Sequence, residues 1–313
     1  MSRAGVGLRL LVQALFFFAA VPVQVLAMRL GWRLAGWMPV LFHRLFLRMF
    51  RLRVEVRGAL SSGAPVLVLA NHASWLDICV LGSLAPLSFV AKSEVAGWPV
   101  VGLFARLQRT VFIDRARRTH TATVNAAVAR RLAAGDVIVL FPEGTSSDGN
   151  RVLPFRSALV GAARAALAGS EGGTIHLQPL AITYTRRNGL PLTRRDRPQA
   201  AWYGDMDLAP HLSGFLTGGP FDARVTWGEP VPFEAATDRK RAAAQAEAAV
   251  RRAFHDRTIP GHSAAASRAE PGTRGLAPAA VPWSPVVGSG LAASPRPGMT
   301  RVQRPKLRRK TIS

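Results

Sequence analysis

Apolar and polar residues alternate in blocks along the middle of the chain. Short apolar runs predict strands, and several lack polar alternation, as expected of strands that are covered on both faces. The predicted strands are residues 65–70, 88–91, 110–113, 137–141, 174–184 and 223–227. Residues 119–134, 157–168 and 238–254 have the spacing and the end signals of helices. This order predicts an α/β fold, with a mostly parallel sheet covered by helices.

The amino-terminal segment has a different pattern. Residues 10–28 are apolar apart from two Gln and one Pro, and about 19 residues is near the lower limit for crossing a bilayer. Residues 29–53 combine Arg with Trp and Phe, a composition typical of a helix that lies in a membrane interface. A secretory signal and a buried core helix are the alternatives. Residues 1–54 contain eight Arg and no acidic residue, so we predict membrane-associating helices that contact anionic lipid headgroups.

The net charge of +23 is concentrated at the two ends of the chain. Residues 55–259 hold 24 basic and 17 acidic residues, as in an ordinary soluble domain, whereas residues 260–313 hold nine basic residues and one acidic residue. The last segment is rich in Pro, Ala, Ser and Gly, and predicts a disordered basic tail. The single cysteine excludes a disulfide framework and a cysteine-based zinc or iron–sulfur site.

The first predicted strand runs directly into Asn71-His-Ala-Ser-Trp-Leu-Asp77. On a straight helix a five-residue offset is about 140°, so Asp77 can orient His72 only if His72 lies on the turn before a helix. One imidazole nitrogen would then bind the carboxylate, and the other would be free to take a proton from a hydroxyl. The alternative is structural, because Ser74-x-x-Asp77 is also a capping-box pattern.

Three further blocks follow at strand ends or inside strands. They are Phe112-Ile-Asp-Arg115, Phe141-Pro-Glu-Gly-Thr145 and Leu177-Gln-Pro-Leu-Ala-Ile182. Together with His72-x4-Asp77, this order resembles the glycerolipid acyltransferases of the 1-acylglycerol-3-phosphate O-acyltransferase family. The resemblance covers roughly residues 30–230.

The resemblance implies a role for each matched residue. His72 would be the general base that removes a proton from a lysolipid hydroxyl, and Asp77 would orient it. Arg115 would bind the phosphate of the acceptor, and Lys92, which lies outside the four blocks, could add a second positive charge there. The remaining matched residues, which would hold the glycerol backbone, are Glu143, Gly144 and Thr145. Cys79 is interpreted as a small buried hydrophobe, and we predict neither an acyl-enzyme nor a metal.

The implied reaction moves a fatty acyl chain from acyl-CoA or acyl carrier protein to the free hydroxyl of 1-acyl-sn-glycerol-3-phosphate, giving phosphatidic acid without a cofactor. Both donors are cytoplasmic in bacteria, and six Arg lie between residues 29 and 53. The prediction is therefore an enzyme on the cytoplasmic face of the inner membrane.

Two alternatives to this acceptor and activity stay open. Many family members have a cation directly after the third block, but here Ser146, Ser147 and Asp148 follow. Residues 202–206 are similar to a segment of lyso-ornithine lipid acyltransferases, so lyso-ornithine lipid is the alternative acceptor. The alternative from another class is a non-enzymatic basic protein that binds membranes or nucleic acid. Its nucleic-acid form is disfavoured because the charge lies at the ends and the chain has only two Tyr.

Overall fold

The computed structural model describes residues 3–62, 64–113, 120–167 and 174–256. Its helices are α1 (Arg3–Arg29), α2 (Leu34–Met49), α3 (Leu76–Gly82), α4 (Val101–Leu107), α5 (His120–Ala133), α6 (Gly161–Leu167), α7 (Leu208–Gly218) and α8 (Arg239–His255). Short 3-10 helices cover Ser93–Gly97, Ser157–Val160 and Arg197–Gln199. The predicted disordered tail at residues 260–313 lies outside the described residues.

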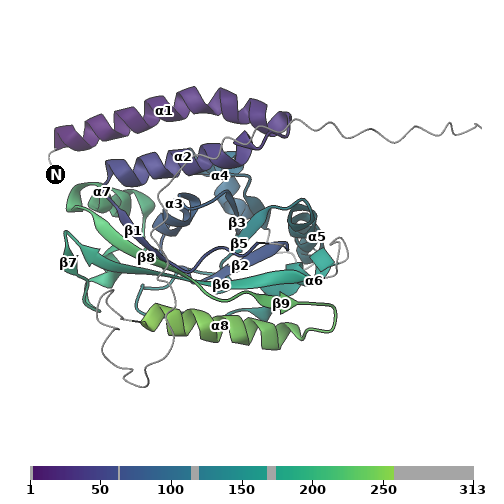
Figure 1. The fold of residues 1–313 in the computed structure, drawn as a ribbon. Helices are drawn as coiled ribbons and strands as arrows, with labels where there is room; N and C mark the ends of the chain where they lie inside the picture. The colour runs from purple at the N-terminus through teal and green to yellow at the C-terminus, as the bar shows by residue number, and fades with distance from the viewer. Residues whose placement is uncertain (1–2, 63, 114–119, 168–173, 257–313) are drawn as a thin grey trace, which may run out of the picture. The chain divides into compact units, whose positions relative to one another are not determined.

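A central sheet organises the domain (Figure 1). Its strands are β1 (Arg53–Arg57), β2 (Val66–Ala70), β3 (Leu87–Lys92), β4 (Val111–Ile113), β5 (Val137–Leu140), β6 (Ile175–Arg187), β7 (Leu190–Pro191), β8 (Phe221–Trp227) and β9 (Val231–Phe233). The main order is β1-β8-β6-β2-β5-β3-β4. From β6 to β4 the neighbours run parallel, whereas β7, β8 and β9 pair with β6 in the antiparallel sense.

Helices cover both faces of this sheet, which confirms the predicted α/β class. On one face, α2, α3 and α7 pack on alternate strand residues such as Val68 and Val139. On the other face, α5, α6 and α8 pack on Leu67 and Ile138, which point the opposite way. All five residues of β2 are buried, which explains why its sequence is apolar without alternation.

The six predicted strands and the helices predicted at 119–134 and 238–254 are present, with ends that differ by a few residues. The helix predicted at 157–168 is divided into a 3-10 helix, Ser157–Val160, and α6. The prediction missed β1, whose sequence Arg-Val-Glu-Val-Arg alternates between charged and apolar residues. β1 pairs in parallel with β8 at the sheet edge. The predicted domain boundary between residues 54 and 55 falls inside this strand.

The amino-terminal helix α1 lies along α2, above the sheet in Figure 1. Ala4–Arg29 is long and apolar enough to cross a membrane by length and composition. Its two glutamines face the protein: Gln13 donates to the carbonyl of Phe42, and Gln24 donates to the carbonyls of Ala35 and Leu107. The opposite side exposes an apolar stripe made of Leu8, Leu11, Leu15, Phe18 and Leu26.

Candidate active site

His72 lies on the turn between β2 and α3, and Asp77 lies in the first turn of α3. The His72 Nδ1–H donates to Asp77 Oδ2 at 2.8 Å. The histidine side chain keeps 21% of its surface exposed, whereas the aspartate side chain has none. Because Nδ1 faces the carboxylate, the lone pair of Nε2 is available to accept a proton. The turn therefore supplies the geometry that a straight helix could not.

The Asp77 carboxylate also holds the start of α3. Its Oδ2 accepts from the backbone N–H groups of Ala73 and Ser74, at 2.8 and 3.0 Å. Its Oδ1 accepts from the hydroxyl of Tyr184 at 2.8 Å. Asp77 therefore contacts both the backbone just before α3 and the imidazole of His72, the two kinds of partner weighed as alternatives from the sequence. A carboxylate has enough lone pairs to do both.

The third block approaches His72 from the end of β5. The ring of Phe141 stacks on the imidazole, with centroids 4.1 Å apart and planes 20° apart. The His72 backbone N–H donates to Glu143 Oε1 at 3.4 Å, and the Ser147 N–H donates to the His72 carbonyl at 2.9 Å. Neighbouring parallel strands end at the same sheet edge, which is why two blocks far apart in sequence meet here.

Glu143 is buried, with an exposed fraction of 2%. Burial raises the pKa of Glu143 to about 8, although the backbone N–H groups of His72 and Leu153 favour its charged form. The Glu143 carboxyl is therefore mostly protonated at neutral pH. Gly144 follows with φ of 74°, a left-handed conformation that suits glycine at this tight turn, and Thr145 is exposed.

The two predicted cations differ in what the structure shows of them. Lys92 is the exposed last residue of β3, which lies next to β5 and ends at the same edge of the sheet as His72. Arg115 lies outside the described residues.

Burial, followed by the nearby charge of Asp77, raises the pKa of Cys79 to about 12, so its thiol is a poor nucleophile. Within the described ranges, no group of three His, Cys, Asp or Glu could hold a metal ion.

Two contributors to the site were not recognised as such from the sequence. Tyr184 is 107 residues from Asp77 and enters through β6. The backbone of Trp202 contacts the other side of the turn: its backbone N–H donates to the Ala73 carbonyl at 2.8 Å, and its backbone carbonyl accepts from the Ser146 hydroxyl at 2.6 Å. The sequence did single out residues 202–206, but gave no signal that they contact the His72 turn.

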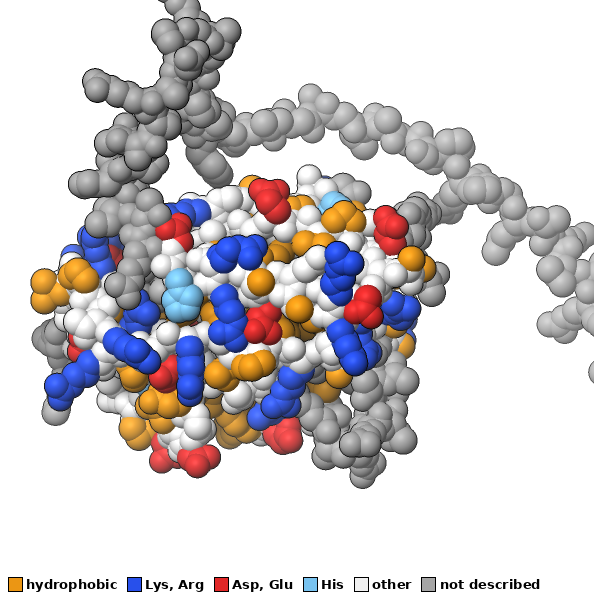
Figure 2. Space-filling model, turned by 90° about the horizontal axis from the view of Figure 1, so that it is seen from below, with side chains coloured by type: hydrophobic (Ala, Val, Ile, Leu, Met, Phe, Trp, Pro, Cys, Tyr) orange, Lys and Arg blue, Asp and Glu red, His pale blue; other side chains and the backbone are white. Residues whose placement is uncertain are grey.

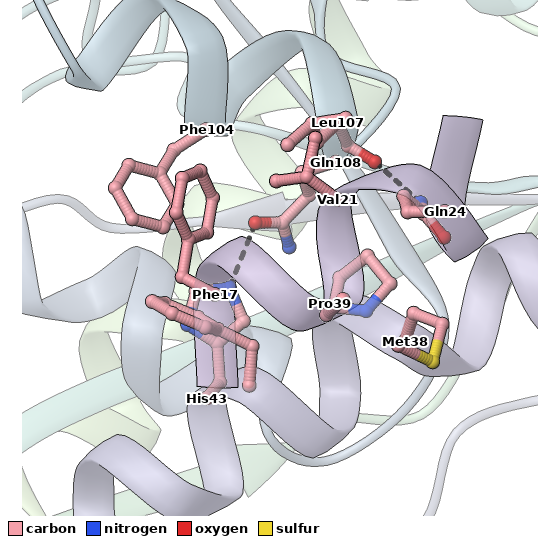
Figure 3. Close-up of a pocket in the computed structure, with 11 residues that line it drawn as sticks. Phe17, Val21, Gln24, Met38, Pro39, His43, Phe104, Leu107 and Gln108 are labelled. Carbon is pink, nitrogen blue, oxygen red and sulfur yellow. Dashed lines mark hydrogen bonds between the residues drawn. The ribbon is translucent and has the colours of Figure 1, made fainter. Parts of the chain in front are cut away.

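A separate apolar pocket lies between α1, α2 and α4 (Figure 3). Phe17, Phe42 and Phe104 line it, and His43 binds Gln108 at its wall with an Nε2–Oε1 distance of 2.7 Å. Burial lowers the pKa of His43 to about 4, so this imidazole is neutral at physiological pH. None of the predicted site residues is among the residues lining this pocket.

Comparison with known proteins places this geometry in a family. A model of the acyltransferase family matches residues 51–183, which contain all four blocks. A lyso-ornithine lipid O-acyltransferase from Brucella abortus (strain 2308) is 49% identical over 233 residues, or 74% of this chain and 86% of that protein. The chain belongs to the acyltransferase family.

Other relatives of this acyltransferase carry two kinds of name. A lyso-ornithine lipid O-acyltransferase from Rhizobium meliloti (strain 1021) is 44% identical over 251 residues, or 80% of this chain and 86% of that protein. A 1-acyl-sn-glycerol-3-phosphate acyltransferase from Neisseria gonorrhoeae is 45% identical over 94 residues, or 30% of this chain and 37% of that protein. The resemblance seen in the four blocks is thus confirmed at the level of the family.

A solved structure shares the fold. The 1-acyl-sn-glycerophosphate acyltransferase PlsC from Thermotoga maritima superimposes with a TM-score of 0.51 at 21% identity, over 80% of this chain and 96% of that one. At this identity the likeness concerns the fold alone. It agrees with the α/β acyltransferase architecture described above.

Proposed function

We propose that this acyltransferase moves a fatty acyl chain from a thioester donor to the hydroxyl of lyso-ornithine lipid. The observation that supports the chemistry is the His72–Asp77 contact, which leaves Nε2 as the basic atom of a half-buried imidazole. The observation that supports the acceptor is the pair of relatives with that name, which this chain matches over 86% of the length of each.

The proposed reaction needs one base and no covalent enzyme intermediate. His72 Nε2 removes the proton of the acceptor hydroxyl as its oxygen attacks the thioester carbonyl, and Asp77 stabilises the imidazolium that forms. When the tetrahedral intermediate collapses, the carbon–sulfur bond breaks and the imidazolium returns its proton to the departing thiolate. Acyl-CoA or acyl carrier protein is the proposed donor. The high pKa of the Cys79 thiol, about 12, agrees with direct transfer.

Lysophosphatidate is the second candidate acceptor and was favoured by the sequence analysis. The Neisseria relative carries that activity in its name, but its similarity covers 30% of this chain. Under this alternative Arg115 and Lys92 bind the phosphate, and Glu143, Gly144 and Thr145 bind the glycerol backbone. We favour lyso-ornithine lipid because Ser146, Ser147 and Asp148 follow the third block without a cation. A dianionic phosphate would have one ligand fewer there.

We propose that the enzyme lies on the membrane through α1 rather than crossing it. Gln13 and Gln24, eleven residues apart, both bind backbone carbonyls outside α1, so α1 follows the protein surface over much of its length. α2 beneath it packs into the domain core through Phe46 and Leu47. The exposed apolar stripe of α1 then faces the lipid, as in an interfacial helix.

The charges on the two sides of the domain agree with this orientation. Arg48 and Arg51 are exposed at the end of α2, where they can reach anionic headgroups. The α8 face, on the other side of the sheet, carries scattered Lys and Arg with acidic side chains between them (Figure 2). The cytoplasmic face of the bacterial inner membrane is the proposed location, because both donors are made there.

The test is an acyl-transfer assay with purified protein in mixed micelles. Lyso-ornithine lipid and lysophosphatidate are each supplied with acyl-CoA or acyl carrier protein, and products are identified by mass. We expect diacylated ornithine lipid to form fastest, and His72→Ala to lower turnover by about 10² to 10⁴. Faster acylation of lysophosphatidate would replace the acceptor and keep the mechanism. Full turnover by His72→Ala would refute the mechanism itself.

A further inference from the structure

The two oxygens of the Asp77 carboxylate have different partners. Oδ2 accepts from His72 Nδ1 and from the backbone N–H groups of Ala73 and Ser74. Oδ1 accepts from the Tyr184 hydroxyl at 2.8 Å. Among the hydrogen bonds between described residues, this is the one that reaches Oδ1. Tyr184 therefore holds the Oδ1 atom of the carboxylate whose Oδ2 atom contacts the proposed base.

Burial makes this hydrogen bond matter. Asp77 has an exposed fraction of 0% and Tyr184 of 4%, so water is a poor substitute for the phenol. Burial and then the charge of Asp77 raise the pKa of Tyr184 well above its usual value. The phenol keeps its proton throughout the range of an enzyme assay, and it remains a donor to the carboxylate.

Strand β6 holds Tyr184 rigidly against the His72 turn. Two residues earlier on the same face, the Ile182 N–H donates to Asn71 Oδ1 at 2.8 Å, and Asn71 Nδ2 donates to the Ile182 carbonyl at 2.9 Å. This pair of bonds fixes the register of β6 beside the residue that precedes His72. The Tyr184 ring also packs edge-on against Phe221, with centroids 6.2 Å apart.

We propose that Tyr184 is a positioning residue of the His72–Asp77 pair, whose hydroxyl holds the carboxylate rotamer and tempers its basicity. The inference rests on the proposed function, since it assigns Tyr184 to the same proton transfer. A hydrogen bond to one oxygen draws electron density from the carboxylate and weakens its hold on a proton held by the imidazole. Loss of the bond strengthens that hold and frees the carboxylate to rotate.

The other titratable groups near Asp77 decide which part of the pH profile is informative. They are His72, Cys79 and Glu143. The pKa of Cys79, about 12, lies outside the assay range, and the pKa of Glu143, about 8, affects the alkaline limb. The acid limb of kcat/KM, which reports the base of the proposed reaction, is therefore the readout.

The experiment compares Tyr184→Phe with a matched control, Thr185→Val, in the micelle assay. Thr185 is the next residue on β6, and its hydroxyl donates to the Asp222 carbonyl at 3.2 Å, away from the pair. We expect Tyr184→Phe to lower kcat roughly 10-fold to 100-fold, with KM for the acceptor changed less than about twofold. The acid limb should move about 0.5 to 1 pH unit higher, as expected for one lost hydrogen bond. Thr185→Val should leave kcat and the acid limb unchanged.

A second variant, which keeps the hydroxyl but changes its strength as a donor, tests the direction in which the acid limb moves. It does not depend on the folding of Tyr184→Phe. Fluorination at position 184 with 3-fluorotyrosine makes the phenol a stronger donor of the same shape, so the acid limb should move to lower pH. An unshifted acid limb in both variants, or a KM effect without a kcat effect, would overturn the inference. The proposed function fails separately, if wild-type enzyme transfers no acyl chain or His72→Ala is fully active.

Discussion

Replacing Asp77 separates its two roles, because Asn and Ala differ in which of its hydrogen bonds they keep. In Asp77→Asn the amide oxygen can accept from Ala73 and Ser74, and the amide N–H can donate to the Tyr184 oxygen with the hydroxyl turned around. The fold should lose only about 1 kcal/mol. The imidazolium of His72 loses its counter-charge, however, and we expect turnover to fall by about 10² to 10⁴.

Asp77→Ala should behave differently. It leaves three buried donors without an acceptor, namely the N–H groups of Ala73 and Ser74 and the hydroxyl of Tyr184. At about 1 kcal/mol or more for each orphaned donor, the free energy of unfolding should fall by roughly 3 kcal/mol or more. That loss is a large part of the total stability of a domain, about 5 to 15 kcal/mol. Activity should be lost as well.

The measurement combines steady-state turnover with denaturant unfolding of each variant. Asp136→Asn is the matched control. Asp136 lies just after the end of α5 and forms ion pairs with Arg109 and Arg131, so the same substitution is made at a carboxylate that does not contact His72. It should keep its turnover. If Asp77→Asn retained wild-type turnover, Asp77 would be a helix cap and no more. If Asn and Ala destabilised the protein equally, the account of its backbone hydrogen bonds would be wrong.

The remaining predictions use pH, thiol chemistry and membrane binding. Since the pKa of Glu143 is raised from 4.5 to about 8, the native protein keeps a proton that the unfolded chain has released between these values. Between pH 6.5 and 8 the free energy of unfolding should fall by about 1 kcal/mol per pH unit, since the full slope of about 1.4 kcal/mol per unit is halved at the native pKa, and Glu143→Gln should remove this dependence. The pKa of His43 is lowered from 6.5 to about 4, so its effect on stability has the opposite sign. The free energy of unfolding should fall as the pH is lowered from 6.5 to 4, and His43→Gln should abolish this loss. Iodoacetamide at pH 7.5 should leave the native enzyme active and Cys79 unmodified by mass, because this partly buried thiol has a pKa raised to about 12 and keeps its proton; rapid inactivation would contradict that raised pKa. Arg48→Gln should weaken sedimentation with anionic vesicles at low salt, and Arg252→Gln on the α8 face should not; equal effects would argue against the proposed orientation.

The sequence alone predicted six strands and three helices of the central region because their signals are local. Burial on both faces of β2 and β5 requires apolar residues at every position, and this pattern is visible without a structure. The contact between His72 and Asp77 was predicted only conditionally. The spacing allowed it if His72 lay on the turn before a helix, and a capping box was the alternative; the structure shows the turn and the contact.

Only the tertiary structure decided what surrounds that pair. Phe141 stacks on His72 because β5 lies beside β2, and Tyr184 reaches Asp77 because the register of β6 is fixed at Asn71. Such contacts depend on strand order and register, and a shift of one residue would turn Tyr184 to the other face of the sheet.

Burial is the second property that the sequence did not contain. The same carboxyl group of Glu143 would have an ordinary pKa on a surface loop, and its raised pKa, about 8, follows from the side chains and backbone packed around it.

The position of α1 was also not determined by the sequence, since the hydropathy of this helix is high enough for it to cross a membrane. The bonds of Gln13 and Gln24 to carbonyls of the domain indicate instead a helix that lies along the protein. Hydropathy records how apolar a segment is, and only packing records what covers each of its faces.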